Sequence, residues 1–184
     1  LMRSSAASDV YKRQSKDWVT FSLNLLGDCG EIGKFQYAPL IGPDILSGIL
    51  VNTTGRSVFD FATEYLFTPL GIEVKDKITF SSEEEQVAFL KAKDINGWVI
   101  DSCGINAAGW GLTLSTRAMA KIGQLYLNQG RWNKQQIVSK QWVIDSIKKQ
   151  SYNDELNLAY GYLWWLHQDG FMAMGDGGNV IYVN

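Results

Sequence analysis

Apolar residues at helical spacing predict a series of short helices over about residues 17 to 147. Each expected helix begins at a residue whose side chain accepts a hydrogen bond from a backbone N–H of the first turn. These capping residues are Asp17, Ser57, Ser115 and Ser139. The faces that follow hold Trp18, Phe21 and Leu25, then Met119, Ile122 and Tyr126, and lastly Trp142, Val143, Ser146 and Ile147. We therefore expect amphipathic helices that each bury one face.

Two more helices, and further detail of the helix at Ser57, follow from other signals. Pro43 and Asp44 open a helix that ends at Gly55, and its expected buried side holds Ile45, Leu46, Ile49 and Leu50. Ser57 and Asp60 form a capping box, and the helix after them is expected to run to about Phe67, where Pro69 stops it. The stretch "SSEEEQVAFLKAKD" predicts an exposed helix with a thin apolar stripe of Val87 and Leu90. A negatively charged binding site is the alternative interpretation of its glutamates.

The last third of the chain is typical of antiparallel strands. "RWNKQQIV" predicts a small hairpin with Asn133 and Lys134 near its tip. "YGYLWWLHQDGFMAMG" predicts two strands joined at residues 168–170, and "NVIYVN" predicts a third. Helices first and antiparallel strands last indicate an α+β fold rather than alternating βαβ units.

Composition excludes several classes of function. The chain has 184 residues, 46% hydrophobic and 20% charged, which suits one globular domain. The net charge is −2, without a basic stripe, so a nucleic-acid partner is not expected. No apolar run is long enough for a membrane span. With one histidine, His167, and two distant cysteines, Cys29 and Cys103, neither a metal site nor a cofactor is expected. A Cys29–Cys103 disulfide stays open for an exported protein.

The first residues do not follow the pattern of the rest. The segment "LMRSSAASDVYKRQSKDW" has no helical or strand period. Its "SSAASDVYKRQ" resembles translated sequencing adapter, a contaminant of metagenomic reading frames. We therefore expect residues 1–16 to be a non-native or disordered tail and residues 17–184 to be the folded part. This interpretation also implies that the natural gene, which we expect to be bacterial, begins further upstream.

Four stretches occur in the order found in a known family. They are "DWVTFSLNLL", "FQYAPLIGPDILSGILVNTTGRSVFDFATEYLFTPLGI", "GWGLTLSTRAMAKIGQLYLNQGRWNKQQIVSKQWV" and "YGYLWWL…FMAMGDGGNVIYVN". Together they resemble the serine β-lactamase-related hydrolases, which include class C β-lactamases, DD-peptidases and related esterases. The resemblance covers residues 17–184. It implies part of the β-lactamase/DD-peptidase fold: the mostly helical domain and C-terminal strands of the central sheet.

The resemblance also implies where chemistry takes place. In the family, a serine of a Ser-x-x-Lys helix attacks a carbonyl, and the lysine and a tyrosine manage its proton. Tyr37 matches the tyrosine and is the catalytic candidate. Asp176, Gly177 and Gly178 match the third motif, beside the substrate. Glycine suits that position because a side chain there would keep substrate from the backbone.

Three departures from the family pattern point to an inactive chain. Pro39 stands where the family often has asparagine. Asp176 replaces the usual lysine or histidine, and its negative charge is expected to repel a carboxylate-bearing substrate such as a penicillin. No Ser-x-x-Lys motif precedes Tyr37. The same spacing occurs at residues 146–149, after Tyr37, on a helix that we expect to be peripheral. His167 is expected to be a solvated turn residue at a hairpin tip.

The sequence therefore predicts a fragment of a serine hydrolase that acts on an ester or amide through an acyl-enzyme, inactive as it stands. Its substrate would be a small molecule or peptide-like, and the resemblance implies a periplasmic or extracellular location. Two alternatives stay open: a non-catalytic relative whose cleft binds peptide or glycan, and a self-contained α+β interaction domain. The sequence does not determine the oligomeric state.

Overall fold

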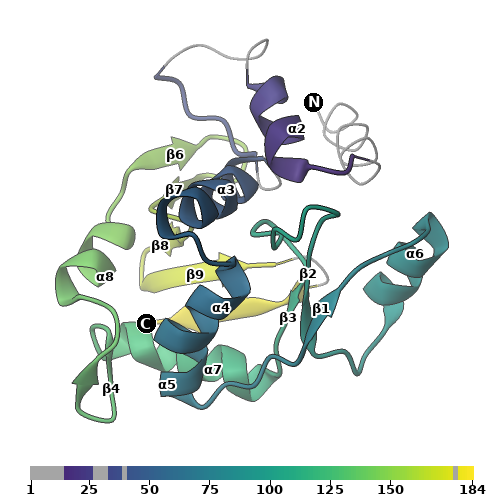
Figure 1. The fold of residues 1–184 in the computed structure, drawn as a ribbon. Helices are drawn as coiled ribbons and strands as arrows, with labels where there is room; N and C mark the ends of the chain where they lie inside the picture. Colours follow the sequence, from purple (N-terminus) through teal and green to yellow (C-terminus); the bar gives the residue numbers. More distant parts are fainter. Residues whose placement is uncertain (1–14, 27–32, 39–40, 176–177) are drawn as a thin grey trace. The chain divides into compact units, whose positions relative to one another are not determined.

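The computed structural model describes residues 15–26, 33–38, 41–175 and 178–184, and Figure 1 shows its helices and strands. These residues form two compact units. Unit 1 draws on Leu1–Gly30, Ala38–Thr63 and Val74–Thr113, and unit 2 on Glu31–Tyr37, Glu64–Glu73 and Leu114–Asn184. The fold is α+β, as the sequence predicts, and each unit has its own sheet.

Among its described residues, unit 1 combines four helices with a small mixed sheet. The helices are α2 (Trp18–Leu25), α3 (Gly42–Thr54), α4 (Val58–Ala62) and α6 (Glu83–Lys91), and the strands are β1 (Asp76–Ile78), β2 (Gly97–Val99) and β3 (Leu112–Thr113). β1 pairs with β2 in parallel, and β2 pairs with β3 antiparallel. Trp18, Val99 and Ala107 form a buried core. The sequence did not predict this sheet, because strands of two or three residues are too short to show a period.

The predicted caps are confirmed. The Asp17 carboxylate accepts a hydrogen bond from the backbone N–H of Thr20. Ser57, Ser115 and Ser139 likewise accept from the residue three positions later, Asp60, Ala118 and Trp142. Gly55 ends α3 in the left-handed conformation.

The buried side of α3 differs from the prediction. Leu46 and Ile49 are about half exposed, whereas Asp44 and Ser47 are buried. Two features explain the reversal. The Asp44 carboxylate accepts hydrogen bonds from backbone N–H groups of residues 108 and 109, and Gly48 lets Val19 of α2 approach the helix closely. Backbone hydrogen bonding and a small residue therefore decide this face, rather than hydrophobicity.

Two further details correct the sequence analysis. On α6, Val87 and Leu90 are exposed, while Gln86 is buried and Phe89 packs on the core of unit 1. The helix after Ser57 does not stop at Pro69. It passes through a π-helical turn, η1 (Thr63–Phe67), into α5 (Thr68–Leu70) and ends at Gly71. Pro69 fits there because it lies in the first turn of α5, where a proline needs no intrahelical N–H bond.

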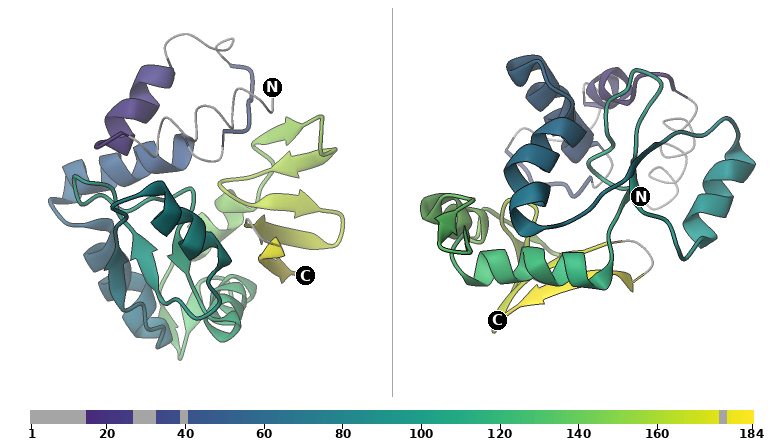
Figure 2. Two further views of the ribbon diagram at one scale, coloured as in Figure 1. Left: turned by 90° about the vertical axis from the view of Figure 1, so that its right-hand side faces the viewer. Right: turned by 60° about the horizontal axis from the view of Figure 1, so that its bottom comes forward.

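Unit 2 is built on a five-stranded antiparallel sheet. The strands β6 (Ser151–Asn153), β7 (Leu158–Tyr160), β8 (Trp165–His167), β9 (Gly170–Met174) and β10 (Val180–Val183) lie side by side in chain order. The sequence predicted β9 and β10, expected one strand over residues 160–167 where the structure has the end of β7 and the whole of β8, and missed β6. The helices of this unit are α5, α7 (Thr116–Leu127) and α8 (Lys140–Ser146). Figure 2 shows α7 running along the sheet beside β9 and β10.

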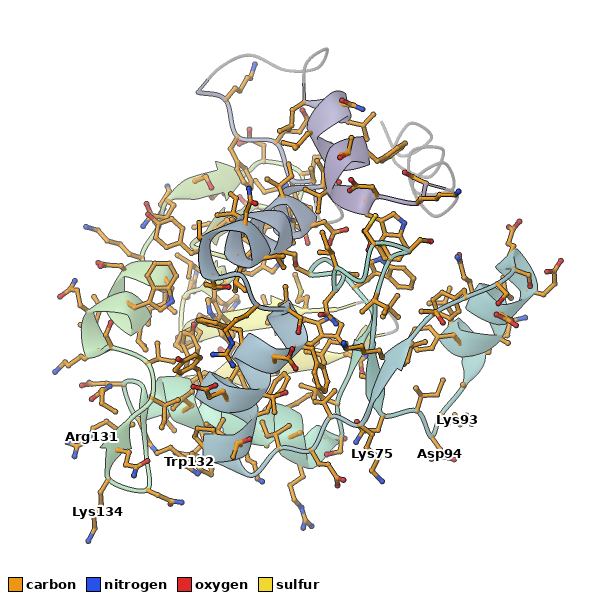
Figure 3. The ribbon with its side chains drawn as sticks, viewed as in Figure 1. Lys75, Lys93, Asp94, Arg131, Trp132 and Lys134 are labelled. Atoms are coloured by element: carbon orange, nitrogen blue, oxygen red, sulfur yellow. The ribbon has the colours of Figure 1, made fainter. Side chains whose placement is uncertain are left out.

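The predicted hairpin lies in unit 2 as β4 (Arg131–Trp132) and β5 (Gln135–Gln136). Asn133 and Lys134 at its tip have positive φ angles of 46° and 68°, as a two-residue hairpin turn requires. Figure 3 shows Arg131 and Lys134 pointing outward from the hairpin.

Candidate active site

Tyr37 lies within a group of four aromatic rings of unit 2, which we call the Tyr37 cluster: Phe35, Tyr37, Tyr160 and Trp165. The Tyr37 ring is 4.9 Å from the Trp165 ring and 5.7 Å from the Tyr160 ring, both edge to face. Tyr160 also meets Trp165 at 4.5 Å and Phe35 at 5.5 Å. Such pairs are stabilising at these distances, so β7 and β8 hold Phe35 and Tyr37 on the sheet.

Strand register places the cluster on the sheet face opposite α7. Tyr160 pairs with Trp165, and Trp165 pairs with Met172, so the three side chains share one face. The other face carries Ile181 and Val183, which approach Gly123 of α7. The helix and Tyr37 therefore occupy opposite sides of one sheet.

The glycine turn joins β9 to β10. The Gly175 N–H donates to the carbonyl oxygen of Asn179 at 2.8 Å. Gly178 has φ +80°, a conformation that favours glycine, and a Cβ there would meet open space. Conformation thus explains glycine at 178. Asp176 and Gly177 lie outside the described residues, so their predicted contact with substrate remains a prediction.

Tyr37 and the glycine turn lie along the same part of the sheet. Tyr37 touches Trp165, whose partner across the strands is Met172, three residues before Gly175. At about 3.3 Å per residue, these three steps correspond to about 10 Å. This length runs along β9 from Met172 to the turn. A substrate between Tyr37 and the turn, and the catalytic role of Tyr37, remain predictions.

Both phenols of the cluster are protonated at neutral pH, and burial shifts their ionisation further into alkali. It raises the pKa of Tyr37, and a hydrogen bond with Trp165 lowers this pKa by a smaller amount. Burial, together with the charge of an ionised Tyr37, raises the pKa of Tyr160 to about 12. A tyrosine that serves as a general base needs a lowered pKa. In the described residues the phenol is held in place but not activated.

The raised pKa of Tyr160 predicts a loss of stability in alkali. The ordinary value is 10.0 and the folded value is about 12, so folding favours the neutral phenol. The stabilisation is fully present below pH 10 and is lost as the pH rises through 12. Tyr160→Phe should remove about 1–2 kcal/mol of this dependence, discounted for partial exposure. Urea unfolding at pH 9 to 12 measures it, with the exposed Tyr162→Phe as control. Equal pH profiles for Tyr160→Phe and the unaltered protein would contradict the assignment.

The other titratable and nucleophilic candidates do not join the Tyr37 cluster. Ser146 is buried, and its hydroxyl donates to the carbonyl oxygen of Val143. The Lys149 amine lies over the ring of Tyr152. The 146–149 match is therefore structural, as expected. His167 is an exposed residue at the β8–β9 hairpin, also as expected.

Little else in the described residues suggests a site. Cys103 is exposed, and Cys29 lies outside the described residues, so their pairing stays untested. The part of the chain that is described holds no group of three His, Cys, Asp or Glu side chains arranged for a metal ion. None of its helices has the length and hydrophobicity to cross a membrane.

Comparison with solved structures identifies the fold. A proposed 6-aminohexanoate-dimer hydrolase from Bacillus anthracis is similar over 84% of this chain, with a TM-score of 0.61 and 24% identity. An octameric penicillin-binding protein homologue from Pyrococcus abyssi is similar over 83%, with a TM-score of 0.53 and 18% identity. The chain has part of the β-lactamase and penicillin-binding protein fold.

This likeness concerns only part of the fold. The chain spans 36% of the length of each of these two proteins. At such low identity the β-lactamase and penicillin-binding protein fold is established, and the reaction is not. No protein-family model matches the sequence, and no curated protein matches it either.

Sequence reasoning missed the partners of Tyr37. It expected one strand over "YGYLWWLH" and placed neither Trp165 nor Tyr160 in the site. In a single strand these two residues, five positions apart, would lie on opposite faces, whereas the structure pairs them across β7 and β8. The pattern also could not show that the loop carrying Tyr37, more than 100 residues earlier, lies against them.

Proposed function

We propose that this chain is part of a serine hydrolase related to the β-lactamases, which cleaves an ester or amide through an acyl-enzyme. The 184 residues alone do not complete that reaction. The observation that carries this proposal is the Tyr37 phenol, held by Tyr160 and Trp165 on the sheet that leads to the Gly175 turn. This arrangement occurs in a chain with the fold of penicillin-binding proteins.

Tyr37 and the glycine turn each have a role in this proposal. Tyr37 would relay the proton of a serine nucleophile, and Gly178 would leave the backbone beside the carbonyl open. The nucleophile is the missing component. The only Ser-x-x-Lys spacing in the sequence starts at Ser146, which is buried. Acyl transfer therefore requires a serine that the described residues do not provide.

The substrate is proposed to be a small or peptide-like molecule without a carboxylate near the glycine turn. Asp176 would repel such a group, whereas a lysine or histidine would attract it. The aromatic character of the Tyr37 cluster suits an uncharged substrate chain. We also propose that the protein lies in the periplasm or outside the cell.

Covalent probes test the predicted inactivity. A fluorescent fluorophosphonate and a fluorescent penicillin should leave the folded chain unlabelled, because each needs an activated serine. Gel fluorescence and intact mass spectrometry measure the result, with a known serine hydrolase as positive control. Covalent labelling of any serine would refute the inactivity of this chain.

A second candidate is a non-catalytic binding protein for peptide or glycan. The raised pKa of Tyr37 favours it, since a protonated phenol serves as a hydrogen-bonding group rather than a base. Longer forms of the protein distinguish the two candidates. A form with Ser-x-x-Lys ahead of Tyr37 should label, and Tyr37→Phe should slow it by about 100-fold or more. A longer form without that motif would support binding.

A further inference from the structure

Two adjacent tryptophans at the start of β8, Trp164 and Trp165, face opposite sides of the sheet of unit 2. Trp164 packs on Tyr126 of α7 and on Phe171, with ring centroids 4.5 Å and 5.1 Å apart. Trp165 packs on Tyr37 at 4.9 Å. Both tryptophans are buried, with 6% and 3% of their surface exposed. Trp165 therefore acts on the candidate site, and Trp164 serves as its matched control.

The contact between Tyr37 and Trp165 includes a hydrogen bond as well as ring packing. An indole has one polar hydrogen and no acceptor, so its N–H donates and the phenol oxygen accepts. A hydrogen bond to this oxygen favours the ionised phenol, so it opposes part of the increase that burial causes in the pKa of Tyr37. In the described part of the chain, it is the only cause that lowers this pKa.

Tyr160 touches the same phenol ring but contributes differently. Its ring packs edge to face on Tyr37 at 5.7 Å, and the charge of an ionised Tyr37 raises the pKa of Tyr160. Two phenols that repel each other when ionised titrate as a pair. Tyr160 therefore packs on Tyr37 and opposes its ionisation in alkali, whereas Trp165 favours that ionisation.

The neighbouring strands hold Trp165 in place. Trp165 pairs with Tyr160 of β7 on one side and with Met172 of β9 on the other. Its indole also packs on the Tyr160 ring at 4.5 Å. A donor on a strand that lies between two others keeps its direction better than a donor on a loop. The indole N–H is thus suited to hold the phenol oxygen in one orientation.

We propose that Trp165 is a positioning residue for Tyr37: its indole N–H donates to the phenol oxygen and fixes the direction in which the phenol O–H points. This inference rests on the proposed function, in which Tyr37 relays the proton of a serine. Because the indole occupies one side of the oxygen, the phenol proton lies on another side, where a proton partner can take it. The same N–H stabilises the phenolate that remains when the proton leaves.

Nuclear magnetic resonance of the indole N–H groups tests the hydrogen bond in the full chain at neutral pH. The tryptophans are labelled with nitrogen-15, and Trp164→Phe and Trp165→Phe assign two of the seven indole signals. Tyr37→Phe keeps the ring and removes the acceptor oxygen. It should shift the Trp165 N–H proton upfield and speed its exchange with solvent about twofold to tenfold. The Trp164 signal should stay in place.

A second measurement separates hydrogen bonding from packing by the sign of a pKa change. It uses Tyr160→Phe as the background, so that Tyr37 titrates without this ionisable neighbour, and follows Tyr37 by carbon-13 resonance of labelled tyrosine rings. Loss of the donor in Trp165→Phe should raise the pKa of Tyr37, because burial then acts without opposition. If Trp165 only packed on the phenol, its smaller replacement would expose Tyr37 and lower this pKa. Trp164→Phe should leave the pKa unchanged.

Either of two results would overturn the inference: a Trp165 indole signal that Tyr37→Phe leaves unchanged, or a lower pKa of Tyr37 in folded Trp165→Phe. Circular dichroism over the same pH range confirms that each variant is folded. If Trp165→Phe does not fold, the indole measurement decides, because the Trp165 signal is also assigned by its proximity to the Tyr160 ring. A longer form with Ser-x-x-Lys that stays unlabelled would refute acyl transfer and leave the hydrogen bond intact. The two proposals therefore fail separately.

Discussion

Gly130→Ala is expected to lower the free energy of unfolding by about 4 kcal/mol and the melting temperature by about 10 °C. Gly130 has φ +81°, where a side chain is strained, and its Cβ would overlap the carbonyl oxygen of Val138. The Gly130 carbonyl also accepts hydrogen bonds from the N–H groups of Ile137 and Val138. The Cβ position is fixed by the backbone and it meets a backbone atom, so a rotamer change cannot relieve the clash. Urea unfolding followed by circular dichroism measures the loss.

Gly55→Ala provides the matched control. Gly55 also has a left-handed backbone, with φ +67°, but a Cβ there meets nothing within 4 Å. The substitution should therefore cost only the strain of that conformation, about 1–2 kcal/mol. Equal losses of unfolding free energy for Gly130→Ala and Gly55→Ala would contradict the predicted overlap of the new Cβ with the Val138 carbonyl oxygen.

Asp44→Ala is expected to lower the free energy of unfolding by about 3–4 kcal/mol. Asp44 is 2% exposed, and its carboxylate accepts from the backbone N–H of Ala108 at 2.7 Å and of Gly109 at 3.1 Å. Removal of the carboxylate leaves two N–H groups without their acceptor beside buried Ala107. Chemical denaturation at neutral pH, monitored by tryptophan fluorescence, gives the measurement.

Two controls separate charge from burial at this position. Asp44→Asn keeps an acceptor oxygen and should recover about half of the loss, because charged acceptors form the stronger hydrogen bonds. Asp60→Ala removes an exposed carboxylate that accepts from Ser57 and should cost about 1 kcal/mol or less. Stability losses of equal size for Asp44→Ala and Asp60→Ala would contradict the structural role of Asp44.

The segment after β2 shows why the packing of unit 1 could not be predicted. Asp101 accepts from the Trp18 N–H at the start of α2, and Asn106 accepts from the Phe59 N–H at the start of α4. The N–H groups of residues 108 and 109 reach Asp44 of α3. One irregular stretch thus holds three helices through contacts 47 to 83 residues apart in the chain. Such contacts leave no periodic signal in a sequence.

The candidate site was likewise predicted only in part from the sequence. The resemblance to β-lactamase-related hydrolases selected Tyr37 and the glycine turn, and the strand pattern predicted β9 and β10. Neither indicated that Trp165 and Tyr160 would pack on the phenol, or that burial would raise its pKa. A pKa depends on burial and neighbours, which only the folded chain defines.

The sequence by itself determined the local structure of this protein. Ser57, Ser115 and Ser139 begin their helices, Gly55 ends one, and Asn133 and Lys134 form a hairpin turn, because each of these features depends on residues within four positions of one another. Only the tertiary structure decided that α3 buries Asp44 and Ser47 instead of Leu46 and Ile49. Hydrogen bonds to distant backbone and the close approach at Gly48 outweigh the hydrophobic pattern there.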